Sequence, residues 1–98
     1  MQSKSTIISN LQQIKPQLLA FGVSNVGLFG SAVKSTKNSN SDIDILLDFD
    51  PKKETYLNYL TSCELLEKTF SGERIDIVTK NGLSPHIGKY ILNEIEYV

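Results

Sequence analysis

The chain has little of several features that mark particular protein classes. Its only cysteine is Cys63, so it can form neither an internal disulfide nor a cysteine cluster for zinc, and a small apolar role on a helix face is expected. Nowhere do about 18 apolar residues follow one another, so a membrane contact is not expected. A cytoplasmic location is expected instead. With 6 glycines and 3 prolines, the composition is that of a globular protein rather than a disordered or fibrous one.

An excess of charge of one sign is also missing. Ten Lys and Arg against eleven Asp and Glu leave a net charge of −1, and no segment gathers the basic residues into a stripe. Because binding along a nucleic acid depends on neutralising many phosphates, nucleic acid is not expected as a direct ligand. A compact nucleotide remains open, since a bound metal can supply positive charge. The 98 residues, 1–98, are expected to form one domain around one core.

The first third of the chain predicts a helix and a strand. Apolar residues at three- and four-residue spacing indicate an amphipathic helix from about Ser3 to Ala20. Because proline lacks an amide donor and clashes with the preceding turn, Pro16 predicts a kink or a break into two helical pieces near Lys15. The short apolar run Val26 to Phe29 predicts a buried strand. A helical turn from Ser31 to about Ser35 and an exposed polar loop should follow.

The rest of the chain predicts two strands and two helices. The stretch DIDILLDF, Asp42 to Phe49, alternates apolar and mostly acidic residues, which indicates a strand with one apolar and one acidic face. A helix with Tyr56 in its core stripe should run to Phe70, and a strand should cover Arg74 to Thr79. A final helix, capped by Ser84 and with apolar positions as far as Val98, should end the chain. The predicted fold class is α+β, with two layers and a small mixed sheet of about three to four strands.

A glycine-serine pair lies where the first predicted strand meets the helical turn. Backbone amides without a partner and the helix dipole favour an anion at such a place. Gly30 would let a phosphate approach the backbone closely, and the hydroxyl of Ser31 could donate to it. The alternative is an ordinary turn followed by a helix cap.

Three aspartates lie on predicted strands. Asp42 and Asp44 are two residues apart, so their carboxylates project from one face with alpha carbons about 6–7 Å apart. Asp76 lies in RIDIV, an otherwise apolar strand. Magnesium prefers oxygen ligands and commonly bridges carboxylates and substrate phosphates, and two ions can stabilise a displacement at phosphorus. The alternative is the solvated face of an edge strand, although repeated like charges on one strand face repel each other.

These motifs resemble those of a known family. The stretch LFGSAVKSTKNSNSDIDILLDF, Leu28 to Phe49, resembles the signature of the DNA polymerase beta-type nucleotidyltransferase superfamily. Within it, the chain most resembles the minimal nucleotidyltransferases, the MNT proteins of HEPN/MNT toxin–antitoxin pairs. The stretch RIDIVTKNGLSPHIGKYILNEIEYV is similar to the last strand and final helix of that family. The resemblance implies a nucleotidyltransferase fold and transfer of AMP from ATP to a tyrosine of a HEPN toxin, which silences the ribonuclease activity of the toxin.

The resemblance also implies roles for individual residues. It assigns Gly30 and Ser31 to the nucleotide phosphates and Asp42 and Asp44 to magnesium. It makes Asp76 the third carboxylate, which helps to hold the metal and can help deprotonate the attacking hydroxyl.

One departure from the family lies after the Gly-Ser pair. The family usually continues x-Ala-Arg-Gly, whereas this chain has Ala32-Val33-Lys34-Ser35. Lys34 keeps the positive charge but lacks the bidentate fork with which arginine binds phosphate. It is therefore either a phosphate contact or a solvated surface lysine.

Three functions follow from the sequence. The leading hypothesis is an adenylyltransferase antitoxin that uses ATP and magnesium, with two ions, and acts on a HEPN-domain toxin. The second is a binding module that keeps the fold and neutralises its partner by contact alone. The third, a nucleotidyltransferase acting on a small molecule or an RNA end, is disfavoured because neither a further domain nor a basic surface is present. Homo-oligomers remain open.

Overall fold

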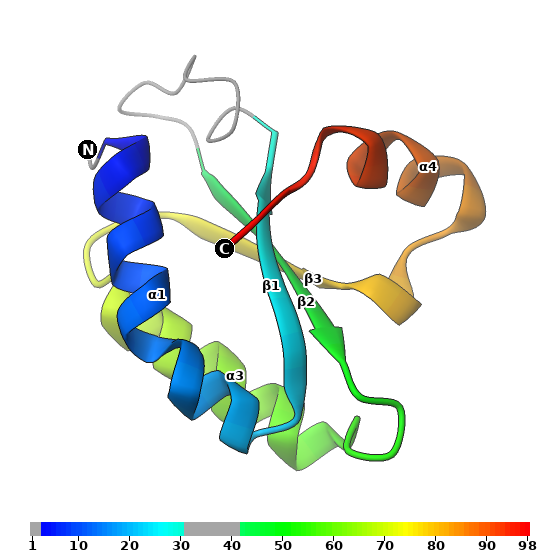
Figure 1. The fold of residues 1–98 in the computed structure, drawn as a ribbon, viewed down its shortest axis with the longest axis horizontal. Helices are drawn as coiled ribbons and strands as arrows, with labels where there is room; N and C mark the ends of the chain where they lie inside the picture. Colours follow the sequence, from blue (N-terminus) through cyan, green and yellow to red (C-terminus); the bar gives the residue numbers. More distant parts are fainter. Residues whose placement is uncertain (1–2, 31–41) are drawn as a thin grey trace.

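The computed structural model describes residues 3–30 and 42–98, which form a four-stranded mixed sheet with helices (Figure 1). The strands lie in the order β3-β2-β1-β4, with β2 parallel to β3 and β1 antiparallel to both β2 and β4. This arrangement confirms the predicted α+β class. The predicted turn at 31–35 and the loop after it lie outside the described residues. The elements are α1 (Lys4–Ala20), β1 (Val23–Phe29), β2 (Ile43–Phe49), α3 (Tyr56–Thr69), β3 (Ile75–Thr79), the 3-10 helix η1 (Lys80–Gly82), α4 (Pro85–Glu94) and β4 (Glu96–Tyr97).

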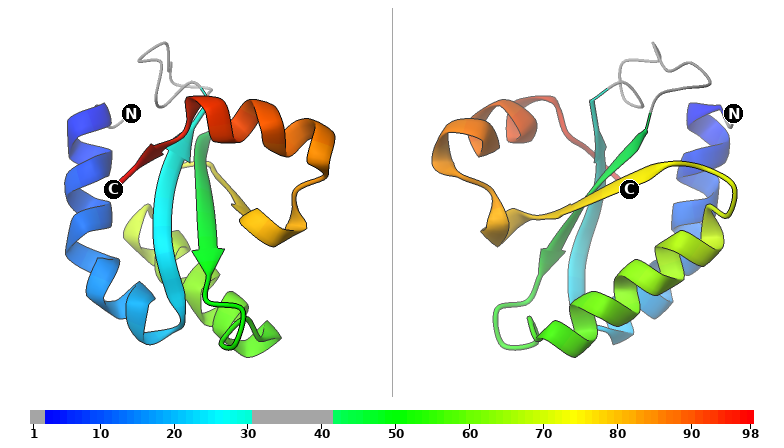
Figure 2. Two further views of the ribbon diagram at one scale, coloured as in Figure 1. Left: turned by 45° about the vertical axis from the view of Figure 1, so that its right-hand side comes forward. Right: turned by 180° about the vertical axis from the view of Figure 1, so that it is seen from behind.

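The apolar face of the sheet carries the core. Ile43, Ile45, Leu47 and Phe49 are buried, as the alternation in DIDILLDF predicts, whereas the aspartates between them are only half-buried. Helices α1 and α3 cover this face, and α4 lies on the other side of the sheet (Figure 2). Fully burying one such side chain contributes about 1.5–3 kcal/mol, so this face holds the two layers together.

Helix α1 runs through Pro16 as one helix, so of the predicted kink or break near Lys15 the break is wrong. Proline at this position removes the amide that would bond to the carbonyl of Gln12. Both Pro16 and Gln12 are exposed, so that carbonyl can bond to water instead. The buried stripe of the helix continues on both sides of the proline. It consists of Ile7, Leu11, Ile14 and Leu18.

Helix α3 buries a face that agrees with the predicted stripe only in its second half. Tyr56, which was expected in the core, is 78% exposed. The buried positions of the helix are Ser62 and Leu66. The hydroxyl of Ser62 donates to the carbonyl oxygen of Asn58 at 2.8 Å, which satisfies its polar group inside the core. A pattern of apolar residues cannot identify such a serine, so the prediction is right for Leu66 and Phe70, which are buried, and wrong for Tyr56.

The end of the chain is a strand rather than a continued helix. Ser84 caps α4 as predicted, because its hydroxyl accepts from the Ile87 amide at 3.2 Å, but the helix ends at Glu94 instead of reaching Val98. Strand β4 then pairs with β1. A Cβ added at Gly27 would lie 2.7 Å from the Ile95 side chain, so glycine in β1 makes room for this crossing. Among the described residues, no helix is long and apolar enough to cross a membrane.

Candidate active site

Two of the three aspartates are neighbours in the sheet. Asp44 on β2 and Asp76 on β3 are paired in the parallel register. Because neighbouring strands lie about 4.8 Å apart and paired residues of parallel strands share a face, both carboxylates belong to the face that α1 and α3 leave uncovered. Asp76 is exposed and Asp44 is half-buried. The structure therefore brings together two carboxylates that lie more than thirty residues apart in sequence.

Gly30 lies beside this pair. It follows β1, whose last residue, Phe29, is paired with Asp44. Gly30 has φ 69°, a backbone conformation that favours glycine. A Cβ at this position would lie 2.4 Å from Oδ2 of Asp44, so a side chain would collide with the carboxylate. Gly30, Asp44 and Asp76 thus form one group, whereas Ser31, Lys34 and Ser35 lie outside the described residues.

Asp42 lies just before β2 and has a basic partner. Its Oδ1 is 3.2 Å from Nε of Arg74, in an ion pair whose side chains are 40% and 73% exposed. The backbone reinforces this contact, because the Ile43 amide donates to the Arg74 carbonyl at 2.8 Å. Arg74 was not identified from the sequence. Aligning DIDI with RIDI would have paired Arg74 with Asp42 and Asp76 with Asp44, in the register that the structure shows.

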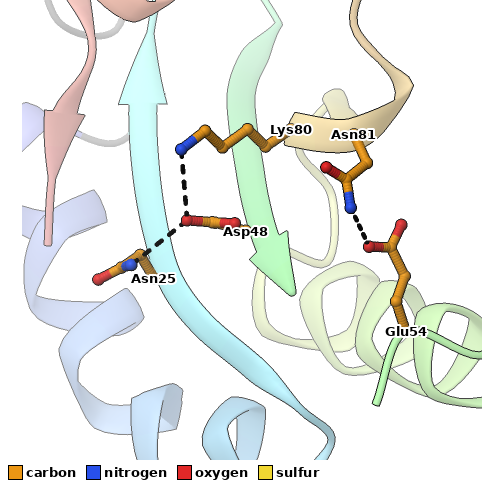
Figure 3. Close-up of polar contacts among 5 residues, drawn as sticks. All are labelled: Asn25, Asp48, Glu54, Lys80 and Asn81. Atoms are coloured by element: carbon orange, nitrogen blue, oxygen red, sulfur yellow. Dashed lines mark hydrogen bonds and ion pairs between the residues drawn. The ribbon is translucent and has the colours of Figure 1, made fainter. Parts of the chain in front are cut away.

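Asp48 lies on the same strand but belongs to a separate group (Figure 3). Its Oδ2 accepts from Nδ2 of Asn25 at 3.4 Å and lies 3.9 Å from Nζ of Lys80. Figure 3 also shows Asn81 donating to Oε1 of Glu54 at 2.7 Å, which connects η1 to the segment before α3. Asp48 is therefore paired with Asn25 and Lys80, at the opposite end of β2 from Asp44.

A further acidic residue reaches the glycine from α4. The Gly30 amide donates to Oε1 of Glu94 at 3.2 Å, and Glu94 is the last residue of that helix. The two residues are separated by 64 positions, and no spacing in the sequence connects them. Their contact depends on β4, which places the end of α4 against β1. Predicting the last segment as a helix thus concealed it.

The aspartates fit a magnesium site in their chemistry, because carboxylate oxygens are the ligands that this ion prefers. Asp44 and Asp76 are already adjacent, while one carboxylate oxygen of Asp42 is paired with Arg74. Within residues 3–30 and 42–98, no group of three or more His, Cys, Asp or Glu side chains is arranged to hold a metal ion. The described residues therefore supply two adjacent carboxylates, which are part of a magnesium site but do not complete it.

Two hollows formed by described residues lie away from this group. One of about 350 Å³ lies at the start of α3 and another of about 340 Å³ lies between η1 and α4, and Gly30 and the three aspartates line neither of them. Beside the first hollow, a hydrogen bond to Cys63 raises the pKa of Tyr59, with smaller contributions from burial and from the charge of Asp76. Burial raises the pKa of the Cys63 thiol. A raised pKa disfavours the nucleophilic thiolate, which agrees with the structural role expected for this cysteine.

Known proteins are similar to this chain in sequence and in fold. The chain is 40% identical over 78 residues to the protein adenylyltransferase MntA of Thermococcus cleftensis, which covers 80% of this chain and 77% of that protein. A solved minimal nucleotidyltransferase matches 97% of this chain and 95% of its own, with a TM-score of 0.83 and 26% identity. A crystal structure of a toxin–antitoxin with AMP-PNP shares the fold, with a TM-score of 0.56 and 20% identity over 98% of this chain and 72% of that chain.

The comparison with protein families covers nearly the whole chain. The nucleotidyltransferase domain family matches residues 6–98, a span that includes Gly30 and all three aspartates. The residues that the structure brings together at the ends of β1, β2 and β3 thus lie inside the matched domain. The chain belongs to the nucleotidyltransferase domain family, and it is an enzyme of the minimal nucleotidyltransferase type.

Proposed function

We propose that this nucleotidyltransferase transfers AMP from ATP to a tyrosine of a partner toxin with a HEPN domain, and thereby acts as an antitoxin. The observation that carries the proposal is the register of Asp44 and Asp76 beside Gly30. Two further findings support it. A relative with 40% identity is named a protein adenylyltransferase, and a protein of the same fold is a toxin–antitoxin with AMP-PNP.

In this proposal one set of residues binds the phosphates of the nucleotide and another binds the metal. Gly30 donates its amide to a phosphate oxygen, and Ser31 and Lys34 add contacts from the segment outside the described residues. Asp42, Asp44 and Asp76 hold magnesium, with two ions as the expected number. Bound magnesium neutralises the negative charge that develops on the phosphate oxygens.

The transfer itself needs an acceptor for one proton. The hydroxyl oxygen of the partner forms a bond to the α-phosphorus of ATP, and the bond from that phosphorus to the bridging oxygen breaks, so pyrophosphate leaves. Asp76 is the residue proposed to accept the hydroxyl proton. It is exposed at the edge strand β3, where a side chain of another protein can reach it. A carboxylate within hydrogen-bond reach of the hydroxyl can act as such a general base.

A second function, neutralisation by contact alone, has its own support. Asp42 is engaged by Arg74, and Glu94 occupies the Gly30 amide, so two proposed ligand groups have protein partners in this structure. In a binding module these contacts would be permanent. In an enzyme they would exchange for magnesium and phosphate.

The test compares wild type with the Asp42→Asn, Asp44→Asn double variant, and uses Glu64→Gln on the exposed face of α3 as the control. The enzyme proposal predicts that magnesium with ATP raises the melting temperature of wild type and of the control but not of the double variant. It also predicts that the double variant no longer neutralises the co-encoded toxin. Unchanged neutralisation by a folded double variant would favour the binding module.

A further inference from the structure

The Gly30 amide, which the proposed function gives to a phosphate oxygen, already has a carboxylate acceptor. Oε1 of Glu94 lies 3.2 Å from this amide nitrogen. Oδ2 of Asp44 also lies close to this glycine, where a Cβ would collide with it. Two carboxylates therefore lie beside a residue that has no side chain.

A phosphate and Glu94 cannot use this amide together. A backbone N–H is one donor, and like charges placed against it repel each other. Magnesium can compensate Asp44 if it binds as proposed, but Glu94 reaches the site from α4, a separate element. The contact of 3.2 Å is longer than the about 2.7–2.9 Å of strong charge-assisted bonds, so it is not among the strongest bonds of this kind.

The backbone that carries Glu94 is held in place, which limits how the exchange can occur. The residue after it, Ile95, packs against Gly27, and β4 then pairs with β1. The Val98 amide donates to the Val26 carbonyl at 2.9 Å. Lys4 on α1 is 2.9 Å from Glu96, which fixes β4 from a second direction. Release of the amide by Glu94 therefore requires a rotation of its side chain rather than a displacement of α4.

We propose that Glu94 is an internal competitor of the nucleotide: its carboxylate occupies the Gly30 amide in the free protein and rotates away when a phosphate oxygen binds there. This inference rests on the proposed function. It adds a residue that sets nucleotide affinity and that lies on α4, which among the described helices is the one on the carboxylate side of the sheet (Figure 2). The chemical class of the ligand is a nucleoside triphosphate with magnesium.

The experiment measures the dissociation constant of AMP-PNP with magnesium by calorimetry. It compares wild type, Glu94→Ala, Glu94→Gln and the control Glu64→Gln. Removing the competing carboxylate should tighten binding by about 3- to 10-fold in Glu94→Ala, the range expected for one ordinary hydrogen bond. Glu94→Gln should fall between Glu94→Ala and wild type, because its amide oxygen still accepts but carries no charge. The control should bind as wild type does.

Each outcome decides between the proposals. If both Glu94 variants fold and bind AMP-PNP no more tightly than wild type, the proposal that Glu94 competes with the nucleotide is wrong. Weaker binding by both variants would make Glu94 a nucleotide ligand or a structural contact instead. If wild type still binds AMP-PNP with magnesium, the proposed function is not contradicted by that result. No binding by any of the four proteins overturns both proposals. If Glu94→Ala does not fold, which circular dichroism shows, Glu94→Gln decides alone.

Discussion

Replacing Gly30 with alanine tests the closest contact of the site. Alanine at φ 69° must adopt a left-handed backbone conformation, which costs about 1–2 kcal/mol of folding free energy. Its Cβ would also lie 2.4 Å from Oδ2 of Asp44, so the carboxylate must move. Because that oxygen is the end of a side chain, the added cost should be at the low end of overpacking, about 1 kcal/mol. The total expected loss is about 2–3 kcal/mol.

Gly72→Ala is the matched control. Gly72 has φ 86°, and a Cβ there would meet nothing within 4 Å, so only the backbone cost of about 1–2 kcal/mol applies. Urea unfolding followed by circular dichroism gives both free energies. In a thermal melt, the difference of about 1 kcal/mol between the variants corresponds to about 4–8 °C for a domain of this size.

A double-mutant cycle identifies the partner of the contact. In an Asp44→Ala background the nearest side-chain atom is the Cβ of residue 44, at 3.7 Å, so Gly30→Ala should cost no more than Gly72→Ala. The coupling free energy between positions 30 and 44 should therefore be about 1 kcal/mol. The reasoning is refuted if Gly30→Ala costs no more than Gly72→Ala in the wild-type background, or if the Asp44→Ala background does not change its cost.

Three further predictions concern packing and charge. Leu46 is fully buried on the carboxylate face of β2, so Leu46→Ala should lower the unfolding free energy by about 2–5 kcal/mol in urea titrations, and a loss well under 1 kcal/mol would contradict its packing. Arg74→Gln should change stability by less than about 1 kcal/mol, because the ion pair is exposed, and calorimetry should show tighter magnesium binding once Asp42 is released. The folded pKa of Cys63 is raised, so above about pH 8.5 the unfolded chain loses the thiol proton first and stability falls. Cys63→Ala should show a smaller fall in urea titrations across this pH range, and an equal fall would exclude the thiol as its cause.

The sequence predicts the buried face of β2 better than it predicts the course of α1 or the buried face of α3. The alternation in DIDILLDF identifies which side chains of β2 are buried, because one face of a strand meets the core and the period is two. Pro16 misleads because its cost depends on whether Gln12 faces water, which only tertiary structure decides. Tyr56 misleads because an apolar pattern gives no weight to Ser62, whose hydroxyl bonds to its own helix.

The sequence also predicts some residues of the candidate site and not others. Gly30 and the three aspartates are recognisable because their spacing follows the strands, and the structure places Asp44 and Asp76 in register. Glu94 is different, because its position beside Gly30 depends on β4, a strand of two residues that follows it and pairs with β1. Strands this short carry too little periodicity to be predicted. The residue that touches the proposed phosphate position therefore emerges only from the folded chain.

The most direct test of the account is the mass of the partner. The wild-type protein is incubated with ATP, magnesium and the co-encoded toxin, and intact mass spectrometry then follows the toxin. The account predicts that the toxin gains the mass of one or more AMP groups on tyrosine, and that it gains none with the Asp42→Asn, Asp44→Asn double variant. A toxin that is neutralised by wild type without any gain in mass would contradict the central claim.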